Sequence, residues 1–156
     1  MPAGKRGENM QTCLLTLDAG TTGLKCTLFS TDGTAVSAAV AEYPVEYPKP
    51  GWAQQPADLF LTAVRESVQK VMASAPEAEI AGIGLSGTMN GCIALDASGN
   101  ALYPNIIHLD TRTIAQVEQI RHVVDEKTFY RSSGNRLDPH YTLPKILWLR
   151  DNEPNV

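Results

Sequence analysis

The chain has 156 residues and a formal net charge of −4, and it is long enough to bury a hydrophobic core. No Lys/Arg run is longer than Lys5-Arg6, which argues against nucleic-acid binding, and no apolar run approaches the roughly 20 residues that cross a bilayer. The three cysteines lack CxxC spacing, so we expect buried free thiols and a cytoplasmic location. Residues 1–11 are predicted to be a disordered lead-in rather than a signal peptide.

The first half of the chain is predicted to form a sheet with a crossover helix. Apolar runs joined by a small-residue turn and by the Asp32-Gly33 turn predict three antiparallel strands. These strands are Thr12–Asp18, Leu24–Ser30 and Thr34–Tyr43. Apolar residues at helical spacing then predict a helix over residues 56–72. The apolar run Ile80–Ser86 follows this helix, so it should lie parallel in the same sheet. This order indicates an α/β chain that opens like the ribonuclease H-like, actin-type fold.

The second half is predicted to contain loops, short strands and three helices. We expect a loop at Pro44–Pro56, a small hairpin at Cys92–Asp96 and Ala101–Tyr103, a brief buried strand at Ile106–Leu109, and helices from Thr111 or Thr113 to about Val124, at Asp125–Ser132 and at Thr142–Asn152. Thr142 is the predicted N-cap of the last helix.

The turn between the first two strands carries groups suited to phosphate. Gly20 and Gly23 lack a Cβ, so backbone N–H groups there can curl toward an anion. Asp18 can hold a metal ion, directly or through water, and Lys25 can neutralise phosphate charge. The alternative is an ordinary hairpin whose Asp and Thr side chains only satisfy the turn.

A second group of polar residues follows the predicted parallel strand. Gly82–Gly87 matches GxGxxG, but no helix directly follows, which argues against a dinucleotide site. Met89 and Asn90 can project into a cleft at the strand end, or they can belong to a tight packed loop. Asp110 and Arg112 are two apart on an extended segment, so they can face one site and bind polyol hydroxyls, or form a structural salt bridge.

Two histidines complete the candidates. His108 follows an apolar run, where a partly buried structural histidine is the common outcome. His140 belongs to the polar loop Asp138–Tyr141, which leads into the last predicted helix and could form a cleft wall.

Five segments together resemble one family. Asp18–Lys25 resembles the first phosphate motif of the FGGY carbohydrate kinases. Four further segments resemble that family in its own order: Pro50–Pro56 the GWxEQDP loop, Ile83–Gly91 the IGISGQMHG motif most familiar from xylulokinases, Leu95–Arg112 the LDxxG…PAILWxDxR run, and Gly134–Trp148 the loop and helix that follow it. Each motif is modest alone, but five in order are specific.

The resemblance implies that residues 12–156 are the N-terminal portion of domain I of an ATP-dependent sugar kinase, which transfers the γ-phosphoryl group to a hydroxyl of a ketose or polyol. It implies that Asp18 holds Mg²⁺, and that Gly20, Thr21, Thr22 and Lys25 cradle the ATP phosphates. It further implies sugar contacts from Met89, Asn90, Asp110, Arg112, His140 and His108. The catalytic Asp, the general base, is expected beyond Val156, so this chain alone should be inactive.

This sequence departs from the family pattern on the sugar side. Gln54 replaces the usual Glu, Thr88 and Asn90 replace the Gln and His of QMHG, and His108 replaces Trp. The sugar therefore stays open. A nucleotide-switch protein of the actin or chaperone type and a sugar-binding module without catalysis are the alternatives. We expect a small sugar or polyol as the partner, and a homo-oligomer, because the cleft face would expose apolar surface.

Overall fold

The structure is a computed structural model that describes residues 10–156. Residues 1–9 of the predicted lead-in lie outside the described residues, and Gln11 already belongs to the first strand. The described chain divides into two compact units. Unit 1 comprises the residues up to Tyr43 with Leu59–Thr88, and unit 2 comprises Pro44–Asp58 with Met89–Val156.

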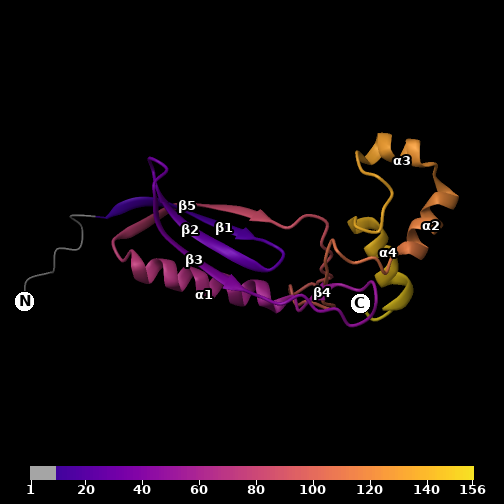
Figure 1. Cartoon of the computed structure of the whole chain (residues 1–156), viewed down its shortest axis with the longest axis horizontal. Coiled ribbons are helices and arrows are strands. Elements are labelled where there is room, and N and C mark those ends of the chain that lie inside the picture. Colours follow the sequence, from indigo (N-terminus) through magenta and orange to yellow (C-terminus); the bar gives the residue numbers. More distant parts are fainter. Residues whose placement is uncertain (1–9) are drawn as a thin grey trace, which may run out of the picture. The chain divides into compact units, whose positions relative to one another are not determined.

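Unit 1 contains a four-stranded sheet with the order β3-β2-β1-β5 (Figure 1). Its elements are β1 (Gln11–Ala19), β2 (Gly23–Ser30), β3 (Ala35–Glu42), the crossover helix α1 (Asp58–Ser74) and β5 (Ala78–Gly87). β1 pairs antiparallel with β2, β2 pairs antiparallel with β3, and β5 runs parallel to β1. The predicted meander, crossover helix and parallel strand are therefore confirmed.

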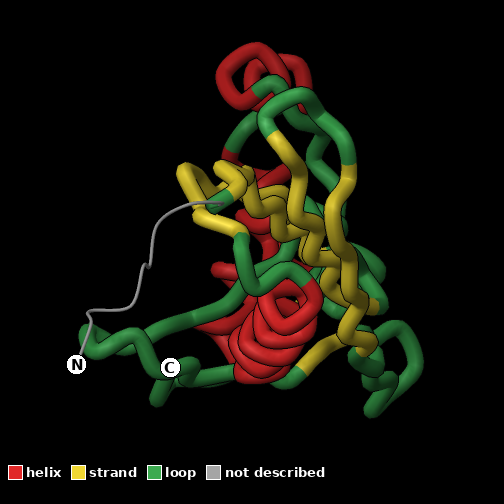
Figure 2. The backbone as a smooth tube through the Cα atoms, turned by 90° about the vertical axis from the view of Figure 1, so that its left-hand side faces the viewer, coloured by secondary structure: helices red, strands yellow, loops and turns green. Residues whose placement is uncertain are grey.

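The core of unit 1 lies between this sheet and α1, which packs along one face (Figure 2). Successive strand residues point to opposite faces, so Cys13 and Leu15 of β1 are buried against the helix, while Leu14 between them is exposed. Ala63 and Val71 belong to the buried face of α1. The sheet thus has one covered face and one face that is free to present polar side chains.

The β5 strand is less well covered. It pairs with β1 on one side and has no partner on the other among the described residues. Ile83 and Leu85 of this strand are 61% and 79% exposed. Apolar side chains this exposed on an edge strand agree with the expectation of an incomplete domain.

Unit 2 is built on very short strands. β4 (Gln54–Gln55) pairs antiparallel with β6 (Asn105–Ile106). The prediction of a loop throughout Pro44–Pro56 is therefore wrong at β4, because a two-residue strand has no periodicity to detect. The predicted small hairpin is reduced to one bridge, Leu95 to Ala101, and Cys92 bridges Ile106 instead.

Three helices complete unit 2: α2 (Ile114–Val123), α3 (Glu126–Ser133) and α4 (Thr142–Asn152). Asp125 caps α3 by accepting from the Thr128 N–H at 3.0 Å, as a carboxylate at this position should. The prediction that Thr142 caps α4 is wrong, because the N-cap is Tyr141 and Thr142 is already helical. Val117 and Ile120 of α2 are buried with Leu147 of α4 packed against them, which joins these helices.

The cysteines behave as expected from their spacing. Cys13, Cys26 and Cys92 are buried and unpaired. Burial raises the pKa of Cys26 and of Cys92, so these thiols stay protonated near neutral pH. Within residues 10–156, no helix combines the length and apolar character that crossing a membrane requires.

Candidate functional site

The β1–β2 turn of unit 1 presents a carboxylate and an ammonium group together. Asp18 and Lys25 are directly opposite each other in the antiparallel pairing, so their side chains leave the same face of the sheet. The neighbouring Leu17 packs toward the α1 side, which places Asp18 and Lys25 on the opposite, uncovered face. Both residues are exposed, as is Thr22 in the turn. These groups can therefore reach a ligand.

Two residues that the sequence did not assign to this turn, Tyr43 and Thr88, hold it in place. The Tyr43 hydroxyl donates to the Gly20 carbonyl at 2.7 Å, and the Tyr43 N–H donates to the Thr22 carbonyl at 3.1 Å. Burial and then the nearby Asp18 charge raise the pKa of Tyr43, so its hydroxyl keeps the proton that it donates. Directly after β5, the N–H and hydroxyl of Thr88 donate to the Ala19 carbonyl at 2.8 and 3.0 Å.

The glycines of the turn meet backbone at close range. The Gly20 N–H donates to the Gly23 carbonyl at 2.9 Å and closes the turn. A Cβ on Gly23 would lie 3.0 Å from the Ala41 carbonyl oxygen of β3, so a larger residue would displace the neighbouring strand. The turn keeps its tight form because both positions lack a side chain.

The chemistry of this turn fits a metal-bound phosphate. No group of three or more His, Cys, Asp or Glu residues is arranged to hold a metal within residues 10–156. Mg²⁺ is usually bound through one or two carboxylates, several waters and the substrate phosphates. Asp18 with Lys25 opposite it supplies one anionic group for the ion and one cationic group for the phosphate.

In unit 2, Asp110 and Arg112 lie together, as their spacing predicted, but their side chains are buried. The carboxylate accepts from the Arg112 Nε and from the Ala53 N–H at 2.8 and 2.6 Å. The exposed fractions of the two side chains are 0% for Asp110 and 1% for Arg112. This burial favours the structural salt bridge that the sequence left open as the alternative.

The Arg112 guanidinium is enclosed by aromatic rings. Its carbon lies 3.7 Å from the ring centroid of Trp52 and 4.9 Å from that of Trp148, and the two rings meet edge to face. The guanidinium also donates to the Gln54 amide oxygen at 3.0 Å. Gln54 stands where the resemblance has Glu, so this partner of the arginine is neutral. We call Asp110, Arg112, Trp52, Trp148 and Gln54 the arginine node.

The loop after β5 has an unusual backbone. Asn90 has φ 63°, a left-handed conformation that asparagine tolerates better than most residues. A Cβ on Gly91 would lie 2.9 Å from the Asn105 side-chain oxygen, which accepts from the Cys92 N–H. Met89 is 77% exposed. The loop backbone is therefore fixed while Met89 stays open to solvent.

The two candidate histidines lie in different surroundings. His140 is exposed, and its N–H and ring bind the Asp138 carboxylate, which lowers the pKa of Asp138. His108 is partly buried, and its Nδ1 is enclosed without a hydrogen-bond partner among the described residues. The loops of Asn90 and His140 are brought together by Lys145, whose Nζ donates to both backbone carbonyls. Within residues 10–156, no hydrogen bond joins His108 to either of these loops.

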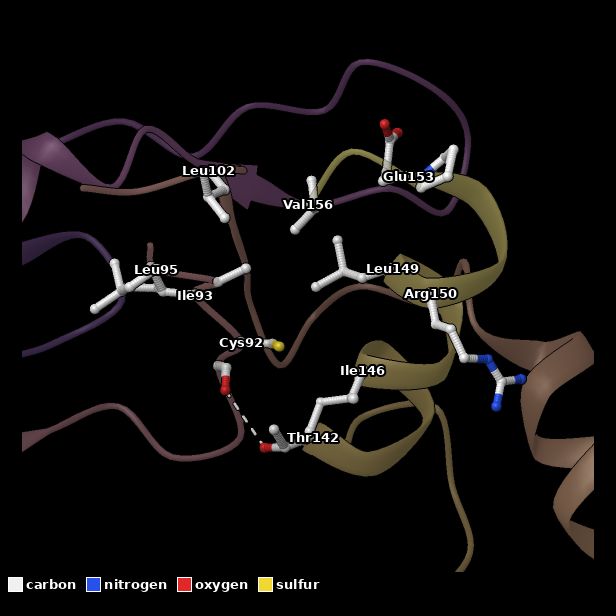
Figure 3. Close-up of a pocket in the computed structure, with 13 residues that line it drawn as sticks. Cys92, Ile93, Leu95, Leu102, Thr142, Ile146, Leu149, Arg150, Glu153 and Val156 are labelled. Atoms are coloured by element: carbon white, nitrogen blue, oxygen red, sulfur yellow. Dashed lines mark hydrogen bonds between the residues drawn. The ribbon is translucent and has the colours of Figure 1, made fainter. Parts of the chain in front are cut away.

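Unit 2 also contains an apolar pocket of about 620 Å³ (Figure 3). Its wall includes the apolar side chains of Ile93, Leu95, Leu102, Ile146 and Leu149. None of the predicted sugar-contacting residues lines this pocket. The lining also includes Thr142, Arg150 and Glu153, so the pocket is mainly but not wholly apolar.

Comparison with known proteins points to one family. A family model described as the FGGY family of carbohydrate kinases, N-terminal domain, matches residues 13–156. The xylulose kinase of Lactococcus lactis subsp. lactis is 31% identical over 147 residues, which cover 93% of this chain and 29% of that protein. The glycerol kinase of Alkalilimnicola ehrlichii is 31% identical over 146 residues, which cover 92% of this chain and 30% of that protein.

Comparison with solved structures points to the same kind of protein. The crystal structure of xylulose kinase from Rhodospirillum rubrum is similar with a TM-score of 0.88 and 26% identity, over 92% of this chain and 30% of that one. Together with the observed sheet order, this likeness confirms the predicted ribonuclease H-like fold class. The chain spans less than a third of the length of each of these relatives.

Proposed function

This chain belongs to the FGGY family of carbohydrate kinases, and from that premise we propose that it is the N-terminal part of domain I of an ATP-dependent sugar kinase. The protein that contains it would transfer the γ-phosphoryl group of ATP to a hydroxyl of a ketose or polyol. The observation that carries this proposal is the exposed Asp18–Lys25 pair at an open hairpin turn, in a chain matched by the family over residues 13–156. The family match also favours a kinase over the nucleotide-switch alternative.

The proposed phosphate side consists of Asp18, Gly20, Thr21, Thr22 and Lys25. Phosphoryl transfer depends on positioning and on charge stabilisation, which are what a fixed turn with one carboxylate and one ammonium group supplies. Asp18 would hold Mg²⁺ through its carboxylate, directly or through water, and Lys25 would meet phosphate oxygens. When bound, Mg²⁺ neutralises charge on the β- and γ-phosphates.

The proposed sugar side consists of Met89, Asn90 and His140, with His108 as a further contact. The Asn90 amide can both donate to and accept from hydroxyl groups, and His140 is exposed on a loop tied to that of Asn90. Asp110 and Arg112 are proposed to serve the sugar side as buried support rather than by touching the sugar. Their buried pair binds the backbone of Ala53 and the side chain of Gln54, and its proposed contribution to the sugar side is to hold that segment in place.

Three further assignments belong to the same proposal. The resemblance puts the carboxylate that would take the proton from the attacking hydroxyl outside this chain, so residues 1–156 alone would not complete the reaction. We place the enzyme in the cytoplasm, which the buried free thiols support. We also expect self-association, which the exposed apolar side chains of β5 would favour.

The test is sugar-dependent ADP formation by the complete gene product with MgATP. The printed names of the relatives supply the panel: xylulose, glycerol and gluconate. We expect at least one of these, or a close stereoisomer, to raise ADP formation about 100-fold or more over the sugar-free rate, because the bound hydroxyl is a better placed nucleophile than water. ATP hydrolysis at the same rate without any sugar would contradict the kinase proposal.

A further inference from the structure

We propose that Lys145 is a positioning residue for the sugar side: its buried ammonium group fixes the loops of Asn90 and His140 at their backbone carbonyls. Lys145 lies in the first turn of α4, and its exposed fraction is 0%. Its Nζ donates to the Asn90 carbonyl and, at 2.8 Å, to the His140 carbonyl. This inference deepens the proposed function and rests on it.

The first turn of α4 binds two consecutive carbonyls of the loop after β5. Lys145 binds the carbonyl of Asn90, and the Thr142 hydroxyl donates to the carbonyl of Gly91 at 3.3 Å (Figure 3). Asn90 has a left-handed backbone, which costs free energy and persists only where the surrounding structure holds it. Without Lys145, the partly buried carbonyl of Asn90 would lose this donor while the left-handed conformation remained to be stabilised.

Inside unit 2, the charged ammonium group of Lys145 donates to the carbonyls of Asn90 and His140. The titratable groups that face it are Asp110, Cys92 and Arg112. Burial, the largest cause, lowers the pKa of Lys145 to about 8, while Asp110 and Cys92 oppose this shift and Arg112 adds to it. The ammonium group is therefore present at neutral pH and is lost on mild alkalisation. Charge-assisted hydrogen bonds are roughly twice as strong as neutral ones, so the loops are held less firmly once the proton leaves.

Deprotonation of Lys145 should change stability and sugar affinity in opposite directions. Its pKa is about 8 in the folded chain and returns to the ordinary value of 10.5 on unfolding. Between those two pH values the unfolded chain binds more protons, so the contribution of this group to folding stability rises with pH. The sugar KM should rise over the same range because the loops lose a charged donor. Partial unfolding with rising pH would lower stability while it raised the sugar KM, so it cannot raise both together.

The experiment uses the complete gene product, with xylulose as the probe or whichever panel compound the wild type phosphorylates fastest. Lys145→Met should raise the sugar KM about tenfold, the value of one charge-assisted hydrogen bond, and leave the KM for ATP within about twofold. Lys145→Arg keeps a charge that persists at alkaline pH, so its sugar KM should stay flat from about pH 7.5 to about pH 9.5, where that of the wild type rises several-fold. Lys127→Met, a matched change at an exposed lysine of α3, should behave like the wild type.

Each outcome decides one of the two proposals. If Lys145→Met folds and keeps the wild-type sugar KM, the positioning role is wrong, whatever its stability. If Lys145→Met does not fold, the wild-type profile decides, and a sugar KM that stays flat through pH 8 to 9.5 overturns the role. If the wild type forms no ADP with any sugar, the proposed function itself fails, and with it the site that Lys145 would position.

Discussion

The turn of β1–β2 in unit 1 and the loops of Asn90 and His140 in unit 2 carry their chemistry in opposite ways. In the turn, the charged side chains of Asp18 and Lys25 are exposed and point away from the core. In unit 2, the charged side chains of Asp110, Arg112 and Lys145 are buried. Lys145 binds the two loops, and the Asp110–Arg112 pair binds Ala53 and Gln54. Charge in unit 1 is thus available to a ligand, while charge in unit 2 builds the support for residues that would contact one.

The largest effect that distinguishes the two regions is expected at Asp18. Asp18→Asn keeps the size of the side chain but removes the charge that would hold Mg²⁺, so turnover by the complete gene product should fall about 100-fold or more. Steady-state ADP formation at saturating sugar measures this fall in turnover. The matched control is Glu66→Gln, at an exposed carboxylate on α1 of the same unit, which should leave turnover unchanged. An Asp18→Asn protein with wild-type turnover would remove Asp18 from the phosphate side.

The next largest effect is expected on folding stability, when the arginine node is altered. Arg112→Met leaves the Asp110 carboxylate buried without its cation, so the free energy of unfolding should fall by about 3 kcal/mol. Urea unfolding of the 156-residue chain can follow it by tryptophan fluorescence, since Trp52 and Trp148 are its two tryptophans and both contact Arg112. Arg131→Met, at an exposed site of α3, should cost well under 1 kcal/mol. Equal losses for both variants would mean that the node is not a stabilising unit.

The smallest effect is expected at Tyr43. Tyr43→Phe removes only the hydroxyl that donates to the Gly20 carbonyl, so stability should fall by about 1 kcal/mol, the usual value of one hydrogen bond. Chemical denaturation measures this loss. Because the turn also loses one of the hydrogen bonds that fix its backbone, the KM for ATP should rise more than the KM for the sugar. The reverse order would place Tyr43 in support of the sugar side.

The sequence predicted unit 1 well because its signals are local. Apolar alternation, the Asp32-Gly33 turn and the helical spacing of residues 56–72 each act over a few residues, and all three features are present. The β1–β2 turn could be located for the same reason. Its supports could not, because Tyr43 and Thr88 bind backbone carbonyls that lie 23 and 69 residues away and leave no local pattern.

Unit 2 was harder to predict because its order comes from distant contacts. The β4–β6 pair is two residues long on each side, and the bridge of Cys92 to Ile106 replaces the local hairpin that the turn residues suggested. Spacing correctly brought Asp110 and Arg112 together, but it could not tell a ligand site from a buried pair. The aromatic rings of Trp52 and Trp148, 60 and 36 residues from Arg112, enclose its guanidinium and leave no local pattern that shows its burial.

The most direct test of this contrast is the sugar affinity of the Asp18→Asn protein, measured by calorimetry on the complete gene product without nucleotide. Suppose that the exposed charge in unit 1 serves the phosphate alone and that unit 2 serves the sugar. The Kd for the sugar that the wild type phosphorylates should then stay within about twofold of the wild-type value, since unaltered contacts keep their free energy. A loss of sugar affinity of about tenfold or more would contradict the account, because Asp18 would then belong to the sugar side as well.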